Sequence, residues 1–349
     1  MDFKLNKALL YKDWKTTKWV AMLMSFSILF TKLFNLMNNL HFQKLYIKSN
    51  GKACPVAWFN HTLLDGEFYF VAMAALVALL SLVLFLNEKG NSYGFLFSMP
   101  LTKKDIVKNK WFLGTSIILG SFLINALLIA LFYLANLKFI DIYSNPFSDI
   151  LKWFFINSTV YILIFTVFIF FQTIMGNVIL SSIIAALAFW VPIFLLVIVS
   201  DLTRTFLKLS YDAKLPIPTD RIANYLCIFT YNTPSFPSNV LTQDNPLNNY
   251  VYEGFSLKLL ISWILIILFL GLSLYCFSNR KLEYNNKIVC NSKLEIAFKW
   301  CVSICTGLMI GAFVGFGYFG DNLIAFSISA ILTIITVYYI LTRVIKVLS

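Results

Sequence analysis

Eight long apolar segments lie along the chain, separated by more polar connections. They lie at about residues 19–37, 67–86, 111–134, 152–174, 178–199, 257–277, 298–319 and 323–342. Each is roughly 20 residues long, the length that an α-helix needs to cross a hydrocarbon core about 30 Å thick. Barrel strands would instead alternate polar and apolar residues over about 10 positions. The pattern therefore predicts an all-α fold, a polytopic transmembrane bundle of about eight spans.

Composition points the same way. Hydrophobic residues make up 59% of the 349 positions and charged residues 13%, whereas a soluble domain carries about 25% charged residues. The formal net charge of +12 would suit nucleic acid if the lysines formed one soluble basic face. They lie instead in the connections between spans, so we expect no nucleic-acid partner.

The placement of lysine and arginine predicts the orientation of the spans. Cytoplasmic connections of membrane proteins carry an excess of these residues. With both termini in the cytoplasm, that side holds Lys4, Lys7, Lys12, Lys15, Lys18, Lys89, Lys103, Lys104, Lys108, Lys110, Arg280, Lys281, Lys287, Lys293, Lys299, Arg343 and Lys346. Lys32 falls inside the first span near its outer end, where we expect it to snorkel to the headgroups.

The same pattern divides the chain into four parts. Residues 1–18 mix lysines with apolar residues and are expected to form an amphipathic helix in the cytoplasmic interface, although a plain basic flank has the same composition. Residues 19–277 form a six-span core with an external loop at 200–256, which is either a lid over an exit path or only a covering loop. Residues 278–297 connect this core to two further spans and a short tail at 298–349.

Small and sulfur-containing residues leave several alternatives open. Gly307, Gly311 and Gly315 recur every four residues, a stripe that lets helices approach closely within the chain or at a subunit interface. Six cysteines are too few and too scattered for a disulfide scaffold or a metal centre. Cys54 and Cys227 both lie in predicted external loops, and the sequence does not decide whether they are bonded.

Catalytic chemistry has no visible support in the spans. They lack the paired acids, the His-Glu-x-x-His helix or the nucleophile beside a base that membrane enzymes use. Their main polar groups, Asn125, Asn157 and Gln172, form hydrogen bonds between helices without proton chemistry. The chain also lacks a phosphate-binding Gly-x-x-x-x-Gly-Lys-Ser/Thr loop. We therefore expect no enzyme, metal or bound cofactor, and uphill transport would draw on another polypeptide.

The connection between the second and third spans is more elaborate than a passive loop requires. Thr102 followed by Asp105 predicts a helix N-terminus that continues into the third span. Pro100 ends the preceding apolar stretch, which predicts a short helix from Tyr93 to Met99 at the membrane surface. Such a bent element is shaped to dock into a partner's cleft.

These residues resemble the permease subunits of type 2 ABC (ABC-2) exporters. Glu88, Gly90 and the stretch Ser98 to Lys103 match, in order, the pattern that these permeases carry between their second and third spans. Arg280-Lys281-Leu282-Glu283 is similar to the element after their sixth span. The continuation through Lys293, Phe298-Lys299-Trp300 and Gly307-x-x-x-Gly311 resembles a subgroup with two additional carboxy-terminal spans.

The resemblance implies partners as well as a fold. It implies cytoplasmic ABC ATPase subunits that hold ATP and Mg²⁺, a second permease copy or a related permease, and membrane lipids around them. The segment implied to couple the ATPase to the spans contains Glu88, Gly90, Tyr93, Phe95, Met99, Pro100, Lys103, Lys104 and Asp105, with Arg280 and Glu283 as a further cytoplasmic motif.

The leading hypothesis is therefore the permease subunit of an ABC exporter in a bacterial cell membrane. Two alternatives stay open at this stage. An ion-coupled or passive carrier is disfavoured by the lack of buried carboxylates in the sequence, and a non-transporting sensor or assembly component would bind no ATPase. The substrate is not indicated.

Overall fold

A computed structural model describes residues 6–51, 58–64, 67–86, 102–143, 145–209, 219–231, 254–280, 292–318, 320 and 322–348. These ranges are helical and contain no strand. Eight of their helical stretches are long and apolar enough to cross a membrane. The prediction of an all-α bundle with about eight spans is confirmed.

The spans are built from α1 (Lys7–Ile28), the π-helical turn η1 (Leu29–Leu33), α2 (Phe34–Asn50), α4 (Glu67–Leu86), α6 (Lys103–Ala135), α7 (Ser148–Ile174), α8 (Val178–Ala188), α9 (Val191–Leu207), α11 (Phe255–Ser278), α12 (Ser292–Ala312), the π-helical turn η5 (Phe313–Tyr318) and α13 (Leu323–Leu348). Shorter elements connect them: α3 (Trp58–Leu64), η2 (Leu137–Phe139), α10 (Thr219–Leu226) and η3 (Ile228–Thr230).

The predicted entry helix and the first span form one continuous helix. Asn6 caps α1 by accepting hydrogen bonds from the amides of Ala8 and Leu9. Helical structure then continues through η1 and α2 to Gly51, which has φ +72° and ends it. Residues 7–50 contain neither glycine nor proline, so nothing breaks the helix near residue 18.

Lys32 corrects one expectation. It lies in the π-helical turn with 2% of its surface exposed, and its ammonium stands 4.8 Å from the centroid of the Tyr69 ring of α4. The prediction that it snorkels to the headgroups is wrong, because the helix packs against α4 at this point. A tyrosine face is a favourable place for a buried cation.

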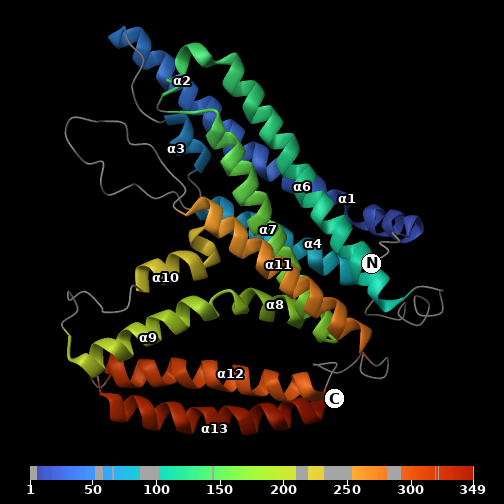
Figure 1. The fold of residues 1–349 in the computed structure, drawn as a ribbon, viewed down its shortest axis with the longest axis vertical. Coiled ribbons are helices and arrows are strands. Elements are labelled where there is room, and N and C mark those ends of the chain that lie inside the picture. Colours follow the sequence, from blue (N-terminus) through green and yellow to red (C-terminus); the bar gives the residue numbers. More distant parts are fainter. Residues whose placement is uncertain are drawn as a thin grey trace.

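Helix α7 forms the centre of the bundle (Figure 1). It packs against α4, α6, α8 and α11. Within its 18-residue apolar stretch, 78% of the residues are buried. Phe122 of α6 stacks on Tyr161 of α7 at 5.4 Å between centroids and also contacts Trp153. The other spans expose more of their surface, which in a membrane protein is the surface that faces lipid or partners.

The two additional spans pair closely. The glycine stripe of α12 and η5 faces α13, and a Cβ added at Gly311 would lie 2.8 Å from the Cβ of Ala330. At Gly315 the added atom would lie 2.5 Å from the Cβ of Phe326. The stripe therefore packs within the chain. In Figure 1 this hairpin lies beside α9, with which both helices are in contact.

Part of the predicted external loop folds back onto the bundle. The ring of Phe229 lies 5.4 Å from that of Phe70 in α4 and 4.9 Å from that of Trp190. Lys258 donates to the carbonyl of Thr230, 3.1 Å away, and burial raises the pKa of Tyr231 to about 12. Helix α9 continues to Leu207 and α11 begins at Phe255, so both helices extend into the predicted loop. Residues 210–218 and 232–253 of the loop and Cys54 lie outside the described residues.

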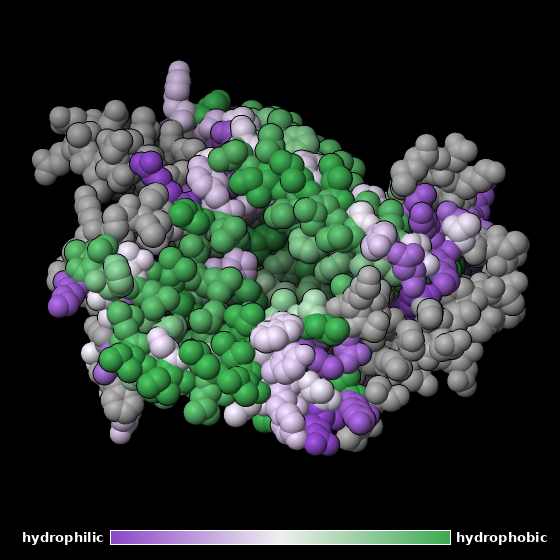
Figure 2. Space-filling view, turned by 60° about the horizontal axis from the view of Figure 1, so that its bottom comes forward, coloured by the Kyte–Doolittle hydropathy of each residue, from purple (hydrophilic) through white to green (hydrophobic). Residues whose placement is uncertain are grey.

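Figure 2 shows a broad hydrophobic face that is hollowed near its middle and bordered by hydrophilic residues. Exposed large side chains include Ile324, Ile331 and Ile335 of α13. A soluble monomer rarely exposes an apolar surface of this extent. The face is suited to the interior of a bilayer.

Candidate coupling site at the start of α6

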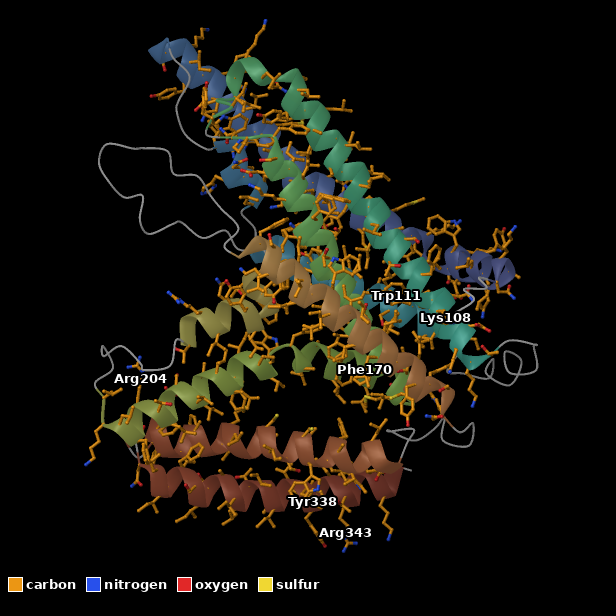
Figure 3. The ribbon with its side chains drawn as sticks, in the orientation of Figure 1. Lys108, Trp111, Phe170, Arg204, Tyr338 and Arg343 are labelled. Atoms are coloured by element: carbon orange, nitrogen blue, oxygen red, sulfur yellow. The ribbon has the colours of Figure 1, made fainter. Side chains whose placement is uncertain are left out.

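Four helix ends meet at one end of the bundle, where α1 and α6 begin and α4 and α11 end (Figure 1). We call it the lysine-rich end, because α1 and the first two turns of α6 contribute Lys7, Lys12, Lys15, Lys18, Lys103, Lys104, Lys108 and Lys110. Figure 3 places Lys108 and Trp111 in this part of α6. The segment 87–101 connects α4 to α6 here and lies outside the described residues.

Helix α6 begins with the predicted cap. The Thr102 hydroxyl accepts a hydrogen bond from the Asp105 amide at 3.2 Å, and the Asp105 carboxylate accepts one from the Thr102 amide at 3.3 Å. This reciprocal pair satisfies two amides that the first turn of a helix leaves unpaired. The prediction that a helix begins here and runs into the third span is confirmed, because α6 extends over 33 residues.

Lysine side chains of α6 hold the carboxy-terminal ends of two other helices. Lys103 donates to the carbonyl of Arg280, directly after α11, at 2.6 Å. Lys110 donates to the carbonyl of Leu84, in the last turn of α4, at 2.5 Å. The last four carbonyls of a helix, among them that of Leu84, lack intrahelical partners, and the carboxy-terminal end of a helix carries partial negative charge. A cation is therefore favourable at Leu84 and directly after α11.

A buried ion pair joins α6 to α1. The Lys110 ammonium lies 3.4 Å from the Asp13 carboxylate, and the two side chains are 0% and 5% exposed. The ring of Phe85 stands 5.2 Å from the same ammonium. The neighbouring residue of α6, Asn109, accepts a hydrogen bond from the backbone amide of Asn6, the cap of α1, at 3.1 Å. Lys110 thus bonds to α1 and α4 at the same time.

The burial of Lys110 explains why all these contacts occur together. Removing an ammonium from water costs several kcal/mol unless opposite charge and hydrogen-bond acceptors replace the water. The Asp13 carboxylate, the Leu84 carbonyl and the Phe85 ring supply that replacement. The arrangement is stable only while α1, α4 and α6 keep their relative positions.

Helix α6 is also fixed to the central helix. The Trp111 indole donates to the Thr166 hydroxyl of α7 at 2.9 Å. A Cβ added at Gly114 would lie 2.0 Å from the ring of Phe165, so a larger residue at this position would have to displace that buried ring of α7. The first three turns of α6 therefore contact four other helices, α1, α4, α7 and α11.

The predicted coupling residues are only partly described. Lys103 and Asp105 lie in the first turn of α6, and Lys104 beside them is exposed. Arg280 follows α11, with its guanidinium 5.9 Å from the ring of Phe277. The remaining predicted residues, Glu88, Gly90, Tyr93, Phe95, Met99, Pro100 and Glu283, lie outside the described residues. A cluster of three metal-ligating side chains is not found in the described ranges.

We did not predict from the sequence that Asp13, Asn109 and Lys110 form one buried contact. We explained Lys110 only by the excess of lysine on the cytoplasmic side and assigned no role to Asp13. A signal was present, because Asp13 falls on the buried stripe of α1 formed by Leu9, Asp13, Thr17, Val20, Met24 and Ile28. A carboxylate and an ammonium on the apolar faces of two helices at the same end predict a buried pair.

Comparison with known proteins adds the family. A family model described as an ABC-2 family transporter protein matches residues 53–231, just over half of the chain. The match spans α4, the connection 87–101, the start of α6 and the central helix α7. Searches of curated proteins and of solved structures give no match. The match and the eight helices agree with the resemblance in the sequence, and the chain belongs to the ABC-2 family of transporter permeases.

Proposed function

We propose that this permease is the transmembrane subunit of an ABC exporter and that a separate cytoplasmic ATPase drives it through the lysine-rich end. The observation that supports this most is the position of Lys110. It holds α4 three residues before the connection 87–101 begins and holds α1 beside it. A partner that moves this connection would therefore move several spans together.

The proposed transmission is mechanical. At 1.5 Å per residue the 33 residues of α6 form a rod of about 50 Å. Its first two turns bond to α1, α4 and α11, and Trp111 and Gly114 hold it against α7. ATP-driven closure of the ATPases would push on the connection, and α6 would tilt with the helices bonded to it. The ATPases would bind ATP and Mg²⁺, and two permease subunits would enclose the path.

The experiment is gentle purification of the tagged permease from its native membrane, followed by identification of associated proteins and measurement of ATP hydrolysis. We expect an ABC ATPase to co-purify. Glu88→Ala and Pro100→Ala test the connection itself. Lys110→Met tests the contacts by which α6 holds α1 and α4. Lys152→Met is the matched control, because its ion pair with Asp149 lies at the other end of the bundle and is 41% exposed on the lysine side.

The expected result is a fall in hydrolysis with the first three variants and no change with the control. Repeated isolation of the permease without an ATPase would overturn the proposal. Transport that persists without ATP would point to an ion-coupled or passive carrier. A protein that binds no ATPase and tolerates all four substitutions would be a sensor or an assembly component.

A further inference from the structure

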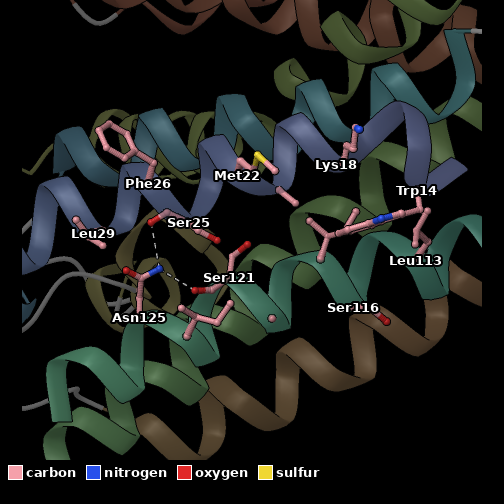
Figure 4. Close-up of a pocket in the computed structure, with 14 residues that line it drawn as sticks. Trp14, Lys18, Met22, Ser25, Phe26, Leu29, Leu113, Ser116, Ser121 and Asn125 are labelled. Atoms are coloured by element: carbon pink, nitrogen blue, oxygen red, sulfur yellow. Dashed lines mark hydrogen bonds between the residues drawn. The ribbon is translucent and has the colours of Figure 1, made fainter. Parts of the chain in front are cut away.

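A surface groove runs between α1 and α6, starting at the lysine-rich end. It encloses about 630 Å³, within the range of small-molecule sites. Most of its lining is apolar, with Met22 and Phe26 from α1, Leu29 from η1, and Leu113, Ile117 and Ile124 from α6. Figure 4 shows the Trp14 indole lying across the space between the two helices at one end and Asn125 near Ser25 at the other.

The two ends of the groove differ in chemistry. Lys18 and Trp14 line the end where the chain leaves the polar entry segment, directly before the first long apolar stretch. A lysine and a tryptophan at that level are the side chains that meet lipid headgroups. At the deep end, the Asn125 amide donates to the carbonyls of Ser25 and Ser121 at 3.1 and 2.8 Å and closes the groove.

The length of the groove matches an acyl chain. Trp14 and Leu29 are 15 residues apart, which corresponds to about 22 Å along the helix axis. Half of a hydrocarbon core is about 15 Å thick, so a chain that enters beside Trp14 can lie along the groove through its leaflet. The groove is open along its side, as a site filled from the bilayer requires.

Charge determines which headgroup fits. The carboxylates of α1 and of the first two turns of α6 are Asp13 and Asp105, and both are engaged, with Lys110 and Thr102. The same segments carry eight lysines, so this end has an excess of positive charge. A basic site between spans near the membrane surface favours anionic lipids.

We propose that this groove is a binding site for one anionic phospholipid, with its phosphate at Lys18 and Trp14 and an acyl chain along α1 and α6. The proposal rests on the membrane location of the chain and does not depend on the ATPase. A lipid in this position would pack against both helices that the Lys110–Asp13 pair joins, and its occupancy would affect how easily they separate.

Glycine positions provide a steric test. A Cβ added at Gly120, which lines the groove, would meet nothing within 4 Å, and the same holds for Gly271 on α11. Gly120→Leu therefore fills the groove with little strain, and Gly271→Leu is its matched control on another helix. Lys18→Gln removes the proposed headgroup contact, with Lys15→Gln as the neighbouring exposed lysine outside the groove.

The measurement is native mass spectrometry of the purified permease in detergent, titrated with palmitoyl-oleoyl phosphatidylglycerol or with phosphatidylcholine carrying the same chains. We expect one preferentially bound phosphatidylglycerol. Lys18→Gln should weaken its binding about fivefold, the effect of one lysine at an anionic surface. Gly120→Leu should weaken it roughly tenfold, since each methylene that loses its apolar contact costs about fourfold in affinity.

The control variants should bind phosphatidylglycerol as the parent does. Equal binding of the two lipids would overturn the proposal, and so would equal losses for Lys18→Gln and Lys15→Gln, which indicate diffuse attraction. A change of oligomeric state in Gly120→Leu without a change in lipid binding would assign the groove to a second copy of the chain instead.

Discussion

Replacing Lys110 by methionine removes the ammonium that joins α1, α4 and α6 while keeping a side chain of similar length. The substitution leaves the Asp13 carboxylate buried, with 5% of its side chain exposed and its cation gone. It also removes the hydrogen bond that the Leu84 carbonyl of α4 accepts from the Lys110 ammonium. Breaking a buried pair by removing one member typically costs about 3–5 kcal/mol, because an uncompensated charge stays in the interior. We expect a loss of stability of that size.

The double substitution Lys110→Met with Asp13→Leu separates stability from coupling. Replacing both members of a buried pair by apolar residues is often neutral or stabilising. The double variant should therefore regain most of the stability that the single variant loses. If the pair transmits motion between α1 and α6, ATP-dependent activity should stay low in the double variant although the protein is stable again.

The assay is thermal unfolding in detergent, followed by tryptophan fluorescence, together with ATP hydrolysis of the complex. Lys152→Met is the control, because its ammonium lies closer to a carboxylate, at 2.8 Å, but is 41% exposed. The Asp149 side chain is 8% exposed but keeps a hydrogen bond from Asn60 when the lysine is removed. Pairs with a water-exposed member contribute little, so burial of the ammonium rather than distance should decide the outcome. Equal destabilisation by Lys110→Met and Lys152→Met would refute this reasoning. Full activity in the double variant would make the pair purely structural.

Three further predictions concern other parts of the molecule. Gly311→Leu should destabilise the α12–α13 hairpin by about 1–3 kcal/mol, because its Cβ would already lie 2.8 Å from Ala330; Gly271→Leu, with open space around it, should leave the melting temperature unchanged. Thr102→Ala should cost about 1 kcal/mol and speed hydrogen exchange in the first turn of α6 only. The pKa of Tyr231 is raised to about 12 by burial, so its neutral form is favoured in the fold. Stability should therefore fall as the pH rises from about 10 to 12, and Tyr231→Phe should remove that part of the loss in alkaline unfolding curves.

Span lengths and caps were predictable because they depend on short stretches of sequence. The eight apolar segments each match a helix of the structure, and the Thr102–Asp105 spacing predicts the start of α6 within one residue. The continuous helix from α1 to α2 was not predicted. Helix continuity there depends on the absence of glycine and proline over residues 7–50, whereas the change from polar to apolar composition at residue 19 indicated a separate interfacial helix before the first span.

The buried charges were the main failure of sequence reasoning. Lys32 and Lys110 were each explained by a general tendency of lysine near membranes, to snorkel or to stay on the cytoplasmic side. Both are at most 2% exposed in the structure. Their partners, Tyr69 and Asp13, lie 37 and 97 residues away along the chain, and a pairing over such a distance depends on which helices are neighbours. Hydropathy gives the spans but not their arrangement.

The arrangement of contacts also indicates which spans a force at the lysine-rich end can reach. Bonds from α6 lead directly to α1, α4, α7 and α11, and these helices contribute to one hydrophobic core. The α12–α13 hairpin packs mainly on itself through its glycine stripe and contacts α9. A tilt of α6 would therefore reposition the core helices with respect to one another while the hairpin stays behind as a unit. If the ATPase acts through α6 as proposed, substitutions on the exposed face of α13 should leave ATP hydrolysis of the complex unchanged.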